Sequence, residues 1–155
     1  MPTVHFLVGV PASGKSTWLK GRKGVVASSD DFIEAEAAKR GATYDAVFAE
    51  TVGAANEHAL ATAKDAFAQG QDLIWDQTNL SRKVRAARLR LVPPGYTKIA
   101  VFFPTPNKRV LTARLKNRPG KTIPPEVVAS MATALERPSK REGFDRIQTR
   151  KRTKK

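Results

Sequence analysis

Cysteine is absent from this sequence of 155 residues, and methionine, tryptophan and tyrosine occur only twice each. The absence of cysteine excludes a disulfide framework and a cysteine-based zinc site, and it is typical of a reducing compartment. Apolar runs are also short. None approaches the roughly 20 residues of a membrane-spanning helix, and the N-terminus lacks a signal-peptide pattern. We therefore expect a cytoplasmic protein with no membrane partner.

Acidic residues become scarce in the second half of the chain. Residues 1–80 hold 7 Lys/Arg and 10 Asp/Glu, a net charge of −3. Residues 81–155 hold 21 Lys/Arg and 4 Asp/Glu, a net charge of +17. This asymmetry favours a polyanionic partner, most often a nucleic acid. The alternative is a highly charged, solvated surface with no partner, because many charge runs do no more than that.

Short apolar runs alternate with segments of helical periodicity along the chain. We expect strands at residues 3–8, 24–28, 72–76, 97–103 and 144–147. We expect helices that begin at residue 17 and that span residues 29–40, 44–69, 82–91, 107–116 and 126–135. In the long helix, an apolar series at helical spacing is expected to face the core: Phe48, Val52, Ala55, Ala59, Ala63 and Phe67.

Strands that alternate with helices predict a three-layer α/β/α fold around a central parallel sheet of four to five strands. No internal repeat or linker divides the sequence. We therefore expect one domain over residues 1–149 and a disordered basic tail over residues 150–155.

The segment Gly9–Ser16 reads G-V-P-A-S-G-K-S and fits the phosphate-loop pattern G-x-x-x-x-G-K-[ST]. A predicted strand precedes it and a predicted helix follows, which is the context that the motif needs. Backbone N–H groups of such a loop bind phosphate, Lys15 reaches the β- and γ-phosphates, and Ser16 ligates Mg²⁺. We therefore expect ATP or another nucleoside triphosphate, together with Mg²⁺. The expected binding residues are Gly9, Pro11, Ala12, Ser13, Gly14, Lys15, Ser16 and Thr17.

Asp30 follows the second predicted strand, at the edge of the sheet where active groups gather. An ionised carboxylate accepts a hydroxyl proton at neutral pH, so Asp30 is the candidate general base. The alternative is a helix cap. Asp31 is able to fill that role through its spacing to Ser28 and to Glu34, which leaves Asp30 free.

Asp76 ends the third predicted strand and begins the sequence Asp76-Gln77-Thr78-Asn79. Its carboxylate is suited to hold Mg²⁺ through water or to orient Ser16. The alternative is a cap on the next helix, a role that Asn79 or Ser81 fills better.

Arginines are concentrated after the third strand. Arg114 and Arg118 lie four residues apart, and Arg118 enters a Pro-Gly loop, from which it is able to neutralise charge on a transferring phosphate. The alternative is a surface arginine. A further basic cluster holds acceptor phosphates or forms a solvated helix face: Arg82, Lys83, Arg85, Arg88 and Arg90.

Four motifs taken together resemble the 5′-hydroxyl polynucleotide kinases of phage and animals. They are Gly-x-x-x-x-Gly-Lys-Ser-Thr-Trp from residue 9, Asp30-Asp31, Asp76-x-Thr78-Asn79 and Arg114-x-x-x-Arg118. The resemblance covers residues 4–147, includes the segment Pro138–Phe144, and implies a P-loop NTPase fold with a short lid that carries an arginine.

The resemblance also implies roles for single residues. Lys15 and Ser16 bind phosphate and Mg²⁺, Asp30 is the general base, and Arg118 is the lid arginine on the transferring phosphate. Arg114 and Ile123 match the positions that sandwich adenine. The implied acceptor-binding residues are Asp30, Thr78, Asn79, Arg82 and Arg85.

Two positions depart from the phage pattern. Ile33 stands where that kinase has an acceptor-binding arginine, and Gln77 stands where it has an acidic residue; Asp76 instead fits the animal spacing. The phosphatase motif D-x-D-G-[ST] is also absent, so an end-healing enzyme of this kind is a kinase only.

We therefore expect a kinase that transfers phosphate from ATP to the 5′-hydroxyl end of DNA or RNA. A phage-encoded protein is compatible with the resemblance. One alternative is a small-molecule kinase for a nucleoside, antibiotic or nucleotide sugar, because zeta-type toxins share Asp-x-Thr-Asn. Another is a non-catalytic nucleic-acid-binding protein that holds the nucleotide as a structural ligand. The charge of +17 favours the polynucleotide, since a small acceptor does not need so large a field.

Overall fold

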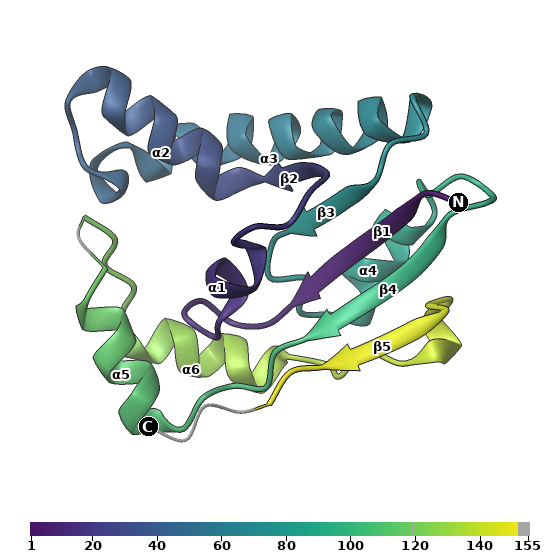
Figure 1. The fold of residues 1–155 in the computed structure, drawn as a ribbon. Helices are drawn as coiled ribbons and strands as arrows, with labels where there is room; N and C mark the ends of the chain where they lie inside the picture. Colours follow the sequence, from purple (N-terminus) through teal and green to yellow (C-terminus); the bar gives the residue numbers. More distant parts are fainter. Residues whose placement is uncertain (119, 152–155) are drawn as a thin grey trace.

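A five-stranded parallel sheet organises the computed structural model, which describes residues 1–118 and 120–151 (Figure 1). The strand order is β2-β3-β1-β4-β5. The strands are β1 (Thr3–Val8), β2 (Val25–Ser28), β3 (Leu73–Asp76), β4 (Thr97–Phe102) and β5 (Arg146–Thr149). The expected parallel sheet is confirmed. From residue 152 on, the predicted basic tail lies outside the described residues.

The helices begin where short polar side chains cap them. Ser28, Thr43, Ser81 and Asn107 each accept the backbone N–H three residues ahead, which satisfies one donor that the helix end leaves unpaired. The helices are α1 (Lys15–Leu19), α2 (Ser29–Arg40), α3 (Tyr44–Ala68), α4 (Arg82–Leu89), α5 (Lys108–Lys116) and α6 (Pro125–Ala134), and Lys140–Glu142 forms a 3₁₀ turn. No helix of the described residues is long and apolar enough to cross a membrane.

Both faces of the sheet are covered, because alternate side chains of β1 point in opposite directions. Val4, Phe6 and Val8 pack against Ala59 and Ala63 of α3 and against their neighbours on the same face. Leu7 packs on the other face with Ile74 and Val101, where Trp18 of α1 covers them. The expected three-layer α/β/α arrangement is therefore confirmed.

The carboxyl ends of the neighbouring strands β2, β3, β1 and β4 meet at one edge of the sheet. Val8 of β1 pairs with Phe102 of β4, and Ser28 of β2 pairs with Asp76 of β3. A further bond joins two of the loops that leave this edge, since the N–H of Gly9 donates to the carbonyl of Thr78 at 3.0 Å. The segments after β1, β2 and β3 are thereby brought together.

The first turns of α3 depart from the expected core series. Val47 and Thr51 are buried there, whereas Phe48 is 40% exposed and lines a cleft with Val52. The reason is that this end of α3 packs on α2 rather than on the sheet, so a different side of the helix is covered. From Ala55 onward the predicted residues are buried as expected.

Candidate active site

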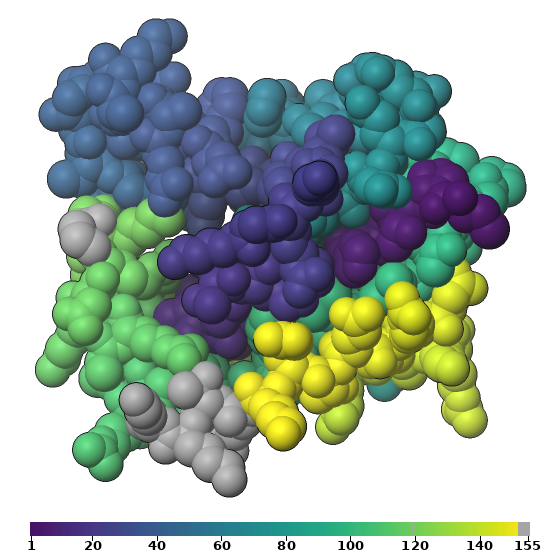
Figure 2. All heavy atoms as spheres, viewed as in Figure 1, coloured from purple at the N-terminus to yellow at the C-terminus, as the bar shows by residue number. Residues whose placement is uncertain are grey.

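A cleft of about 1620 Å³ lies at the carboxyl edge of the sheet. The segment after β1, the start of α2 and α3, the segment after β3, the loop after α5 and α6 all line it. Figure 2 shows the hollow between the blue α2–α3 region and the green α5 region. Pockets for one small ligand hold about 300–1,000 Å³, so this cleft has room for two ligands side by side.

Backbone geometry explains the glycines of the loop after β1. A Cβ on Gly9 would lie 2.6 Å from Ser13 Oγ and 3.0 Å from Phe103 Cβ, so the position has no space for a side chain. Gly14 has a φ of +110°, in the region that favours glycine, and directly precedes α1. The chain therefore turns tightly and presents Lys15 and Ser16 to the cleft.

Lys15 is held back against its own loop. Its Nζ donates to the carbonyl of Gly9 at 2.7 Å. Burial lowers the pKa of Lys15 to about 8, although Asp76 and Asp30 act in the opposite direction. Asp76 shows the complementary effect, because burial raises the pKa of its carboxyl to about 6 against the attraction of Lys15. Burial thus disfavours the charged form of both side chains, because each has lost part of its hydration.

Two buried polar side-chain atoms of the described residues have no hydrogen-bond partner, Ser13 Oγ and Arg118 Nη1. One belongs to the loop after β1 and the other to the loop after α5. An unpaired buried donor costs about 1–3 kcal/mol, so a ligand that supplies oxygen acceptors would be stabilised here. Arg118 lines the cleft and, together with Lys15, fits the oxygens of a triphosphate, whereas Ser13 lies outside the lining with its Oγ close to Gly9.

The oxygen ligands expected for Mg²⁺, Ser16 and Asp76, both line the cleft. No group of three or more His, Cys, Asp or Glu side chains in the described part of the chain is arranged to hold a metal. Mg²⁺ is typically bound through one or two protein oxygens plus phosphates and waters. The donor set therefore fits a magnesium ion that arrives with the triphosphate.

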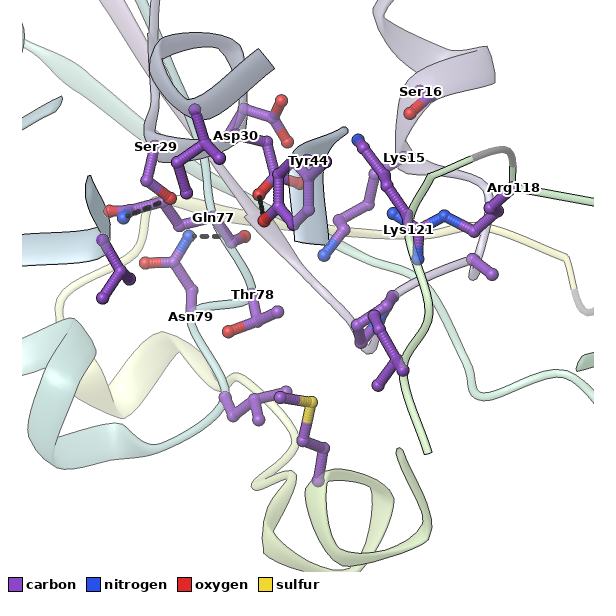
Figure 3. Close-up of a pocket in the computed structure, with 18 of the residues that line it drawn as sticks. Lys15, Ser16, Ser29, Asp30, Tyr44, Gln77, Thr78, Asn79, Arg118 and Lys121 are labelled. Carbon is purple, nitrogen blue, oxygen red and sulfur yellow. Dashed lines mark hydrogen bonds between the residues drawn. The ribbon is translucent and has the colours of Figure 1, made fainter. Parts of the chain in front are cut away.

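Asp30 lies in the first turn of α2 and accepts a hydrogen bond of 2.6 Å from Tyr44 Oη at the start of α3 (Figure 3). Burial and the neighbouring Asp30 raise the pKa of the Tyr44 phenol, so Tyr44 stays a donor. The expected cap by Asp31 is wrong, because Ser28 caps the helix by accepting the Asp31 N–H at 3.3 Å. The consequence for Asp30 is unchanged, since its carboxylate does not cap the helix.

The loop after α5 that carries Arg118 is fastened to the start of α3. Asp45 makes two hydrogen bonds to the backbone of this loop. Its own N–H donates to the carbonyl of Gly120 at 3.0 Å, and its side-chain Oδ2 accepts from the N–H of Thr122 at 2.7 Å. Lys121 pairs with Glu34 and lies 4.8 Å from the centre of the Tyr44 ring. Figure 3 shows Arg118 and Lys121 side by side near Lys15. This loop thus has the position of the expected lid.

The structure contradicts the acceptor role expected for Arg85. Its side chain is fully buried and pairs with Glu142 at 2.8 Å, while Nη1 donates to the carbonyls of Asn79 and Leu80. A guanidinium that is buried and paired in this way is not available to a substrate. Glu142 also accepts the N–H of Ser139, so the pair joins α4 to the 3₁₀ turn near the C-terminus.

Asn79 and Arg82 are also placed differently from expectation. Asn79 is buried with a positive φ of 48°, and its amide donates to the carbonyl of Leu7 at 2.8 Å, so it shapes the loop rather than contacts the acceptor. Arg82 is exposed, lies outside the residues that line the cleft, and pairs with Glu136 at 3.8 Å. The arginine of α4 that does reach the cleft is Arg88, which donates to Asn79 Oδ1.

Most of the other expected residues line the cleft, namely Pro11, Ala12, Gly14, Thr17, Thr78, Arg114 and Ile123, whereas Gly9 and Ser13 lie outside its lining. Arg114 donates to the carbonyl of Ala12 at 3.0 Å and thereby contacts the phosphate loop directly. Sequence reasoning missed Tyr44, Asp45 and Lys121. Their contacts join segments far apart in the chain, and no local motif marks them. The one available signal was the sequence Tyr44-Asp45 directly after a helix cap, on the same edge as Asp30.

Comparison with known proteins agrees with this architecture. The chain is similar to a provisionally assigned kinase from Chloroflexus aurantiacus, with a TM-score of 0.68, 20% identity, and coverage of 96% of this chain and 86% of that one. It is also similar to a gluconokinase from Sinorhizobium meliloti, with a TM-score of 0.52, 19% identity, and coverage of 96% and 81%. At these identities the likeness shows a shared fold.

Among curated proteins, none matches the sequence. The family described as AAA domain matches residues 4–138, and the chain belongs to that family.

Proposed function

We propose that this protein is a phosphotransferase that moves the γ-phosphate of ATP onto a hydroxyl group of a small molecule. The observation that carries the proposal is the Asp30–Tyr44 pair, which lies in the same cleft as Lys15 and Arg118. A base for the acceptor and cations for the donor are thereby available in one cleft.

Each of these residues has a role in the transfer. Asp30 accepts the proton as the acceptor oxygen bonds to the γ-phosphorus and the bond from that phosphorus to ADP breaks. Tyr44 orients the Asp30 carboxylate through its hydrogen bond. Lys15 and Arg118 neutralise charge on the transferring phosphate. Ser16 and Asp76 would hold Mg²⁺, which when bound neutralises phosphate charge.

The charge balance of the cleft supports a small acceptor rather than a polyanion. Five carboxylates line the cleft, namely Asp30, Asp31, Glu34, Asp45 and Asp76, and so do five cations, namely Lys15, Arg88, Arg114, Arg118 and Lys121. Lys15 and Arg118 are assigned here to the phosphate donor, and Lys121 pairs with Glu34. A polyanion would therefore meet no excess of positive charge beside the base.

The polynucleotide hypothesis from the sequence stays a prediction, carried by the +17 charge of residues 81–155. The basic cluster of α4 gives it little support. Arg85 is paired with Glu142 and buried, and Arg82 is paired with Glu136. The fold is shared with a protein described as a gluconokinase, which is a kinase of a small molecule by its name.

The deciding experiment is an acceptor competition. The protein is mixed with γ-labelled ATP, Mg²⁺ and one acceptor at a time: a nucleoside, a neutral polyol, gluconate or a 5′-hydroxyl oligonucleotide. We expect label on at least one small molecule and kcat/KM for it above that of the oligonucleotide. Label on the oligonucleotide alone would replace this proposal with the polynucleotide kinase. Lys15→Ala is the control for label that does not depend on the phosphate loop.

A further inference from the structure

Exposed apolar side chains are unevenly distributed over the described residues. Six large apolar residues are strongly exposed, and three of them line the cleft: Phe48, Val84 and Val127. Large apolar groups in a concave site are a typical feature of ligand recognition, whereas single ones elsewhere on a surface are ordinary.

Phe48 belongs to the acceptor side of the cleft. It lies one turn beyond Tyr44 on α3, with 5.6 Å between the two ring centres, and Tyr44 donates to Asp30. Phe48 is thus next to the pair that meets the acceptor hydroxyl, and it is 40% exposed in spite of its size. The donor residues Lys15 and Arg114 belong to or contact the phosphate loop.

A second apolar wall comes from α4 and α6. Val84 of α4 is 40% exposed and lines the cleft together with Leu80. Val127, Met131 and Ala134 recur at helical spacing along α6 and line it too. Leu80 is bound to the end of α6, since its carbonyl accepts the N–H of Glu136 at 2.9 Å. The two apolar walls therefore belong to different parts of the chain and line one space.

We propose that the acceptor is an uncharged alcohol with an apolar body about the size of an aromatic ring, held by Phe48 and Val84 while its hydroxyl meets Asp30. This inference rests on the proposed phosphotransferase function and names its substrate class. Burial of the ligand and of both side chains removes apolar surface from water. An uncharged body fits because the lining offers no excess of cations: five carboxylates, the base included, accompany five lysine and arginine side chains.

The first test compares acceptors on the unchanged protein. Thymidine and 2-phenylethanol represent uncharged alcohols with a ring, glycerol represents a polar alcohol, and gluconate represents an acid. We expect kcat/KM for a ring-bearing alcohol to exceed that of glycerol and gluconate by about tenfold or more. A preference for glycerol or gluconate would overturn the inference and leave the phosphotransferase intact. The 5′-hydroxyl oligonucleotide is included as a fifth acceptor, and a preference for it would overturn both.

Binding is measured separately, so that the result does not depend on turnover. Calorimetry follows thymidine and 2-phenylethanol as they bind to the protein saturated with a non-hydrolysable ATP analogue and Mg²⁺. Binding of either probe supports the inference. Absence of binding by both probes overturns it, while the analogue's own binding reports on the donor site.

A matched pair of variants on one helix locates the effect. Phe48→Ala should raise the KM or Kd of the ring-bearing acceptor about tenfold to a hundredfold, without a change in the Kd of ATP. Leu60→Ala is the control, because Leu60 is 36% exposed on α3 but lies outside the cleft. Phe48→Leu should retain most of the affinity. Equal effects of Phe48→Ala and Leu60→Ala would overturn the assignment of Phe48.

Discussion

A variant of Asp30, the residue that accepts a hydrogen bond from Tyr44, is expected to separate ATP binding from phosphate transfer. Asp30→Asn removes the proton acceptor but leaves Lys15 and the phosphate loop in place. We expect kcat to fall about 10²- to 10⁴-fold while the Kd of ATP changes less than about threefold. Steady-state kinetics and equilibrium binding of ATP measure the two quantities. Asp65→Asn on α3 is the control, and undiminished turnover of Asp30→Asn would remove Asp30 as the base.

Lys15 is expected to show the opposite effect, because we propose that it binds ATP while burial disfavours its charge in the folded protein. Burial lowers its pKa to about 8, so its charged form is less stable in the folded protein than in the unfolded chain. Lys15→Met should therefore abolish ATP binding and raise the free energy of unfolding at pH 7 by about 1–3 kcal/mol. Chemical denaturation without nucleotide tests this, and a variant less stable than the parent would contradict it.

The lowered pKa of Lys15 also determines in which direction the free energy of unfolding changes with pH. Between the folded pKa of about 8 and the ordinary value of 10.5, the unfolded chain binds more protons at Lys15 than the folded protein does. The contribution of Lys15 to stability therefore improves as pH rises through that window. We expect the stability gain of Lys15→Met over the parent to shrink between pH 7.5 and about 10. A constant difference would argue against a buried charge.

The loop after α5 is expected to affect catalysis through the hydrogen bonds that hold it to α3, because these bonds position Arg118. Asp45 accepts the Thr122 N–H at 2.7 Å, and this bond together with Lys121–Glu34 places Arg118 near the phosphate loop. Asp45→Ala removes the side-chain bond and should lower kcat about tenfold, since Arg118 then spends less time in position. Asp45→Asn keeps an oxygen for Thr122 and should retain most of the activity. Kinetics of both variants provide the test, and equal losses would contradict a positioning role.

At the level of elements, the sequence was sufficient wherever local physics decides. The strand–loop–helix at Gly9–Ser16, the alternation of strands and helices, and helix starts at Ser28 and Ser81 depend on neighbours within a few residues. Arg85 and Phe48 show where this ends. The buried Arg85 pairs with Glu142, which lies 57 residues further along the chain. Phe48 is exposed because the start of α3 packs on α2 with another side of the helix. Neither the Arg85–Glu142 pair nor the packing of α2 on α3 can be derived from the periodicity of the sequence.

The charge of the whole molecule is the feature whose meaning changed most. The sequence has a net charge of +14, and the excess lies in residues 81–155. Some of those cations stabilise the fold instead of facing a partner: Arg85 pairs with Glu142, Arg88 donates to Asn79, and Arg82 pairs with Glu136. Net charge describes how a protein attracts ions at a distance, and it does not identify what the active site binds.

This distinction leads to a prediction about salt. An uncharged acceptor that enters a cleft of balanced charge releases no counterions, so its KM should change less than about twofold between 50 and 200 mM salt when ATP is saturating. A polynucleotide held by six or more phosphate contacts would lose about a thousandfold or more in affinity over the same range. The measurement is a salt titration of KM for the best acceptor in the competition. A steep dependence would mean that the basic half of the chain takes part in acceptor binding after all.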